Sequence, residues 1–139
     1  MLSHYSNSKF KVCDIGSYYL IETNCYSSEK VATVSYGGQY SIVNSEMNEI
    51  DKADIVCLDF TKPHAIATIA ELFYSLKQNK EIHIFIDPTL TNEQITSEYW
   101  FIFYTMDRMY GADYNSIPTN VTRHFVRSEE EIVGVIKSL

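Results

Sequence analysis

The clearest pattern lies in the middle of the chain, where two short apolar runs flank a segment with helical periodicity. The runs cover residues 54–60 (DIVCLDF) and 82–86 (IHIFI), and each has the length of one strand. Between them, apolar residues recur every three or four positions from 65 to 77. Continuous apolar runs are typical of buried parallel strands, and strands joined by a helix pair through a right-handed crossover. Residues 53–86 therefore predict a strand, helix, strand unit.

Patterns toward the C-terminus extend this unit. A long aromatic helix is predicted over Asn92–Tyr110, ending at Gly111, and a strand over residues 121–126. Ser128 with Glu131 fits a capping box that begins a terminal helix reaching Leu139.

The N-terminal part has weaker patterns. A first strand is predicted over residues 9–19, with a break at Gly16, and a second over 31–36 that ends in a turn at the Gly37-Gly38 pair. Residues 21–30 could be extended chain or loop, and residues 39–52 have the apolar spacing of a helix.

Together these elements predict an α/β fold class. We expect one domain over residues 1–139, with a mostly parallel sheet and helices on both faces, as in flavodoxin-like or Rossmann-like folds. The N-terminal half is short for such folds.

Composition and charge exclude several classes of protein. The chain has a formal net charge of −7 and no cluster of lysines and arginines, so binding to nucleic acid is not expected. No apolar run approaches the roughly 20 residues of a membrane-spanning helix, and residues 1–12 lack the blocks of a signal peptide. We therefore expect a cytoplasmic protein without a membrane partner.

Cofactor and metal sites are not predicted either. The three cysteines are widely spaced without a CxxC pair, and the four histidines have no metal-ligand spacing. The Gly37-Gly38 pair is not followed by a phosphate-binding motif.

Aromatic residues are unusually frequent, with eleven tyrosines and seven phenylalanines. On the predicted aromatic helix they occupy all sides. These positions are Tyr99, Trp100, Phe101, Phe103 and Tyr104. We expect burial against the sheet and against another subunit, and so a homo-oligomer.

In open parallel sheets, ligands bind beyond the carboxyl ends of the strands. Three predicted strand ends therefore form the candidate site, at residues 14–18, 59–68 and 87–91. His64 lies in this mouth and is the histidine with a candidate role.

At these positions the sequence resembles the nucleoside 2-deoxyribosyltransferases and the related nucleoside 5'-monophosphate N-glycosidases. The similar segments are residues 11–19 (KVCDIGSYY), 44–60 (NSEMNEIDKADIVCLDF), 68–74 (TIAELFY) and 80–85 (KEIHIF). The third segment fits the family pattern of Thr, two residues, then Glu-Leu-x-Tyr. The resemblance implies a nucleoside or nucleotide substrate.

The resemblance also implies catalytic roles. Glu71 would be the nucleophile that attacks the anomeric carbon of the sugar and forms a glycosyl-enzyme ester. Tyr74, one helical turn further on, could orient this carboxylate. Asp59 is an available carboxyl for recognising or protonating the base, as are Asp14 and Glu46.

Substrate binding is implied for further residues. Asp14, Gly16 and Ser17 lie in the turn where the family holds the sugar or its phosphate. Asn44 and Glu46 fall in the stretch that closes over the ribose in the family. Thr68, which opens the motif, is expected beside them.

Other interpretations of the same residues remain open. Thr68 and Glu71 also fit a capping box, in which Glu71 only binds the start of its helix. Asp59 also fits a loop or cap residue. Because residues 65–67 (AIA) replace the family's Asp-x-Gly and Ser17 its proline, one alternative is a module that binds a nucleotide or an ADP-ribose-like signal without turnover. Another is a structural or inhibitory interaction protein that acts through its aromatic surface.

Overall fold

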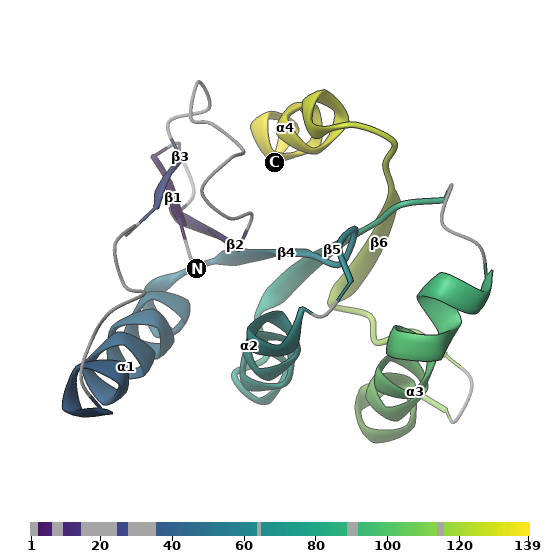
Figure 1. Ribbon diagram of the computed structural model, residues 1–139, viewed down its shortest axis with the longest axis horizontal. Coiled ribbons are helices and arrows are strands. Elements are labelled where there is room, and N and C mark those ends of the chain that lie inside the picture. The colour runs from purple at the N-terminus through teal and green to yellow at the C-terminus, as the bar shows by residue number, and fades with distance from the viewer. Residues whose placement is uncertain are drawn as a thin grey trace.

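Six strands form one sheet in the part of the chain that the structure, a computed structural model, describes (Figure 1). The described residues are 3–6, 10–14, 25–27, 36–63, 65–88, 92–113 and 116–139. The strands are β1 (Ser3–Ser6), β2 (Phe10–Asp14), β3 (Cys25–Ser27), β4 (Ile55–Asp59), β5 (Glu81–Ile86) and β6 (Val121–Phe125). The helices are α1 (Tyr36–Lys52), α2 (Ile66–Lys77), α3 (Asn92–Tyr110) and α4 (Glu129–Ser138).

The sheet is mostly parallel. Its strand order is β3-β1-β2-β4-β5-β6, in which β2, β4, β5 and β6 are parallel and β1 is antiparallel to both β2 and β3. The predicted unit over residues 53–86 is confirmed as β4, α2 and β5.

Helices cover both faces of the sheet, as predicted. From β2 to β6 the parallel strands advance in one direction, so right-handed crossovers place their connecting helices on the same face. Accordingly α1, α2 and α3 lie below the sheet in Figure 1, and α4 lies above it.

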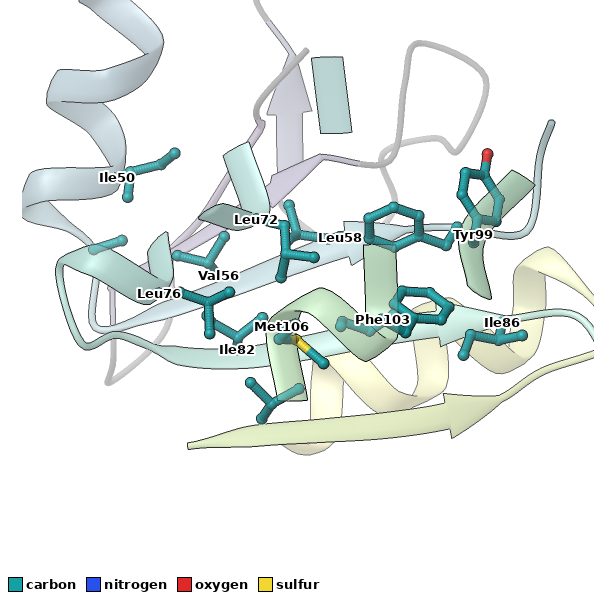
Figure 2. Close-up of a cluster of buried hydrophobic side chains, with 14 residues drawn as sticks. Ile50, Val56, Leu58, Leu72, Leu76, Ile82, Ile86, Tyr99, Phe103 and Met106 are labelled. Atoms are coloured by element: carbon teal, nitrogen blue, oxygen red, sulfur yellow. The ribbon is translucent and has the colours of Figure 1, made fainter. Parts of the chain in front are cut away.

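Each face has its own hydrophobic cluster, which explains why the central strands are apolar throughout. Ile82, Ile84 and Ile86 of β5 pack in the cluster between the sheet and the helices α1, α2 and α3. Figure 2 shows Ile82 and Ile86 in this cluster. Phe85 packs on the opposite face with Ile132 of α4. Alternate side chains of a strand point to opposite faces, and here both faces are buried.

Helix α2 ends in a left-handed residue. Asn79 has a φ of 56°, and its N–H donates to the carbonyl of Leu76 at 3.0 Å. The N–H of Lys80 reaches back to the carbonyl of Ser75 at 3.1 Å, as in a Schellman motif. The left-handed Asn79 and these two hydrogen bonds explain why α2 ends in the polar segment after Lys77.

The predicted limits of the other C-terminal helices are also found. Ser128 Oγ accepts a hydrogen bond from the N–H of Glu131 at 3.2 Å, which confirms the cap of α4. After α3, a Cβ at Gly111 would lie 2.2 Å from the carbonyl oxygen of Ser116 and 2.5 Å from that of Asp107. Only glycine allows this close approach.

The N-terminal prediction needs correction. Helix α1 begins at Tyr36, so Gly37 and Gly38 lie in its first turn and the predicted turn there is wrong. Glycine is unfavourable in the middle of a helix. It is tolerated in the first turn, where the backbone N–H groups have no hydrogen-bond partner within the helix. The strand predicted over 31–36 otherwise lies outside the described residues. Strands β1 and β3 were not predicted, although 25–27 falls in the segment left open between extended chain and loop.

None of the described helices combines the length and the apolar character needed to cross a membrane.

Candidate active site

Glu71 lies on the buried side of α2. The helix starts just after the carboxyl end of β4, and Glu71 is in its second turn, with 1% of its surface exposed. The neighbouring buried polar residues on this side are Thr68 and Ser75. The hydroxyl of Ser75 donates a hydrogen bond to the backbone carbonyl of Glu71 at 2.7 Å. Burying a carboxyl is costly in free energy, so its position on this face requires a reason.

Helix capping is not that reason. The N-cap of α2 is Ala65, which makes no side-chain cap hydrogen bond. Thr68 is therefore inside the helix rather than at its N-cap, and the capping-box interpretation of Thr68 and Glu71 is wrong.

The segment that leads into α2 is fixed by Tyr99 of α3. Its hydroxyl accepts a hydrogen bond from the N–H of Ala65 at 3.0 Å and donates to the carbonyl of Lys62. Its ring packs edge-on against Phe60, with the centroids 5.2 Å apart. The 65–67 segment that departs from the family pattern is thus anchored by a tertiary contact, which no local pattern indicates.

Asp59 ends β4 and belongs to a turn. Its Oδ1 accepts hydrogen bonds from the backbone N–H of Thr61 at 2.8 Å and from the Thr61 hydroxyl at 2.5 Å. The side chain is 7% exposed. This arrangement agrees with the interpretation of Asp59 as a loop residue. It also engages Oδ1 of the carboxyl that was expected to recognise or protonate the base.

Tyr74 joins α2 to α1. Its hydroxyl donates to Asp51 Oδ1 at 2.7 Å. This hydrogen bond, together with burial and the charge of Asp51, raises the pKa of Tyr74 above its ordinary value. The hydroxyl is therefore engaged with α1, whereas the resemblance implies that it orients Glu71.

The remaining predicted residues are placed unevenly. Asp14, at the end of β2, is paired in register with Leu58, so its backbone lies one row before Asp59 at the same edge of the sheet. Asn44 is exposed and Glu46 is half-buried, both on α1. Gly16, Ser17 and His64 lie outside the described residues.

A cleft at the carboxyl edge has a volume of about 150 Å³ and lies between the loop after β4 and the start of α4. Thr61, Lys62, Asp87, Arg127 and Ser128 contribute to its lining, and Glu71 does not. Ligand binding beyond the strand ends predicts this edge. No sequence pattern selects Lys62 and Arg127, which come together only through the order of the strands in the sheet. Within the described ranges, no group of three or more His, Cys, Asp or Glu side chains could hold a metal ion.

Comparisons with known proteins found a likeness among solved structures. No protein-family model matches the sequence, and no curated protein matches it. Among solved structures, the chain is similar to the CMP N-glycosidase BcmB of Clostridium botulinum, with a TM-score of 0.47 and 11% sequence identity. The match covers 70% of this chain and 73% of that chain. A likeness of this size carries no information about the activity of this chain.

Proposed function

We propose that the protein cleaves or exchanges the N-glycosidic bond of a nucleoside or nucleotide, with Glu71 as the nucleophile. The supporting observation is the side chain of Glu71, which is buried in the second turn of the helix that follows β4 and is not its N-cap. Such a position is expensive for stability, and residues of this kind are frequent at functional sites.

The chemistry follows from a carboxylate at this position. A Glu71 oxygen attacks the anomeric carbon while the bond to the base breaks, which leaves a glycosyl ester on the enzyme. The departing base takes up a proton from an acid or from water. Water then hydrolyses the ester, or a second base accepts the sugar, and the free carboxylate returns.

Incubation with deoxynucleosides and their 5'-monophosphates, followed by chromatography of the free base, tests the activity. Glu71→Gln removes the nucleophile and keeps the shape, so base release should fall by on the order of 10³-fold or more. Glu130→Gln, on the exposed side of α4, is the matched control and should be as active as wild type. Equal turnover by wild type and Glu71→Gln would eliminate Glu71 as the nucleophile.

A covalent readout separates nucleophilic from structural roles of Glu71. Acid quenching during turnover, followed by peptide mass mapping, should find a pentosyl adduct on the peptide that contains Glu71. A folded, active enzyme with the adduct on another residue would contradict the assignment.

A second candidate is a nucleotide-binding module without turnover. Asp59 and Tyr74, the two residues expected to assist Glu71 in catalysis, are engaged elsewhere. Asp59 binds Thr61 and Tyr74 binds Asp51, which favours binding without turnover. This function predicts a thermal shift with nucleoside monophosphates and no released base. A shift without release would therefore select the module over the enzyme.

A further inference from the structure

Two histidines on neighbouring strands meet on the face of the sheet that α4 covers. His83 of β5 is 6% exposed, and His124 of β6 is half-buried. Nδ1 of His83 lies 2.7 Å from Nε2 of His124. The ring planes differ by 21° and the ring centroids are 5.0 Å apart, so the rings meet through these two nitrogens rather than through their faces. The proposed reaction makes no use of this pair.

A contact of this length has room for one hydrogen atom between the two nitrogens. When the rings are neutral, or when the pair carries one extra proton, one nitrogen can donate and the other can accept. When both rings are protonated, all four ring nitrogens carry a hydrogen, so both facing nitrogens are donors. N–H bonds of about 1.0 Å would then leave about 0.7 Å between two hydrogens across the 2.7 Å contact. The doubly protonated pair therefore cannot keep this contact, whichever tautomers the neutral rings adopt.

The groups around the pair admit one proton and oppose a second. Oε1 of Glu81 lies 3.0 Å from Nε2 of His83, so this carboxylate can balance one positive charge. The thiol of Cys57, which is paired with His83 in register on β4, lies fully buried in the apolar cluster on this face. Burial, and then the charge of His83, lower the pKa of His124 below its ordinary value. A second proton therefore binds His124 only under acidic conditions.

A protonated His124 has open space beside it. A groove of about 650 Å³ lies between α4 and the end of β6, and both His124 and Glu131 contribute to its lining. The helical wall of the groove is open at Gly134, where a Cβ would have no atom within 4 Å. Arg123 also lines the groove, but its guanidinium binds Asp107 at 3.2 Å. The carboxylate of Glu131 is thus the charged group on the α4 wall that can attract a protonated imidazole.

We propose that His124 is an acid-sensitive latch, whose ring lies against His83 at neutral pH and turns into the groove beside Glu131 when both histidines are protonated. The movement releases the ring of Phe85. This ring stacks on His124, with the centroids 5.4 Å apart, and packs with Ile132 in the cluster between the sheet and α4. Departure of His124 uncovers one side of that cluster, so acid weakens the attachment of α4 to the sheet.

A pH titration of the full chain by NMR tests the latch directly. From about pH 8 to about pH 4.5, the ring nitrogens of His83 and His124 should titrate in two coupled steps, the second below the ordinary value of about 6.5. Nuclear Overhauser contacts between the rings of His124 and Phe85 should be lost in the second step. Spectra of His83→Asn and His124→Phe assign the two histidines. Ring contacts that persist after the second proton has bound, or a His124 that titrates alone near 6.5, would overturn the proposal.

Variants of the neighbouring groups change the latch in opposite directions. His83→Asn offers an amide oxygen near the position of Nδ1, and an amide does not titrate, so a protonated His124 can still donate to it and should stay beside Phe85 in acid. Glu131→Gln keeps an acceptor for the α4 cap but removes the attracting charge, so release should need a pH lower by about 0.2–0.7 units. Glu130→Gln, also exposed on α4, is the matched control and should release His124 like wild type. Release in His83→Asn at the wild-type pH would contradict the role of His83.

Urea unfolding at several pH values gives a measurement that needs no signal assignment. The unfolded chain protonates His124 below about pH 6.5, whereas the folded chain does so only at its lowered pKa. Between these two values the unfolded state binds more protons, so stability falls as the pH falls. The unfolding equilibrium constant of wild type should therefore rise by up to about 10-fold per pH unit relative to His124→Phe, which keeps a ring against Phe85 and does not titrate. An equal acid dependence of the two proteins would refute the latch.

Discussion

At the scale of single residues, Tyr99 shows how a side chain far along the sequence determines the entry to the candidate site. Its hydroxyl serves as donor and acceptor for two backbone groups of the segment before α2. These groups lie 34 and 37 residues away in the sequence. The spacing of Thr68 and Glu71 suggested a helix cap, which is a local pattern. The segment before α2 is instead held by Tyr99, a residue distant in the sequence.

Replacing Tyr99 with Phe should destabilise the protein. The Ala65 N–H and the Lys62 carbonyl lose their partner in a part-buried site, which costs about 1–3 kcal/mol in the free energy of unfolding. Tyr104→Phe, on the exposed side of the same helix, should change that free energy by less than about 0.5 kcal/mol. Urea unfolding of both variants measures the difference, and equal midpoints would show that the Tyr99 hydroxyl has no such role.

At the scale of elements, the predictions succeeded where the pattern is local and long. The helix over Asn92–Tyr110 was predicted to its last residue, because Gly111 ends it by a steric requirement that one residue type meets. Strands β1 and β3 have only 4 and 3 residues. Strands this short depend on their pairing partners rather than on their own periodicity, so they were missed.

The end of α2 gives a test at this scale. Asn79 adopts a left-handed conformation that glycine reaches without strain and alanine does not. Asn79→Ala should therefore lower the free energy of unfolding by about 1 kcal/mol, and Asn79→Gly should leave it unchanged or raise it by up to about 1 kcal/mol. Thermal unfolding with Gln78→Ala as the control, at φ −83°, separates backbone strain from helix propensity. The opposite order of the alanine and glycine variants would contradict the assigned conformation.

At the scale of the whole molecule, the fold was more predictable than the site. Burial on both faces leaves a continuous apolar signal in β4 and β5, so the parallel sheet could be predicted from the sequence. Lys62 and Arg127 both line the cleft at the carboxyl edge, although they are 65 residues apart in the sequence. They come together only because the sheet brings the ends of their strands to one edge. Neither the burial of Glu71 nor its absence from the cap was predicted, because the apolar positions of this segment include Ile66, which is 77% exposed, whereas the polar Thr68 and Ser75 are buried together with Glu71.

The attachment of β6 to α3 is the contact that holds the edge of the sheet to the helical layer below it. Arg123 binds Asp107 at 3.2 Å and lies over the ring of Phe103, 5.1 Å from its centroid. Asp107 is 5% exposed and the Arg123 side chain is 22% exposed, so removing Asp107 leaves a mostly buried guanidinium without its counter-charge. Asp107→Leu should therefore cost about 2–4 kcal/mol in the free energy of unfolding.

Replacing both partners should be less harmful than replacing one. The double variant Asp107→Leu with Arg123→Met leaves no uncompensated charge and keeps the ring of Phe103 covered, so it should recover most of that loss. Urea unfolding of the single and double variants at one protein concentration gives the coupling. Additive losses would mean that the ion pair does not hold β6 on α3.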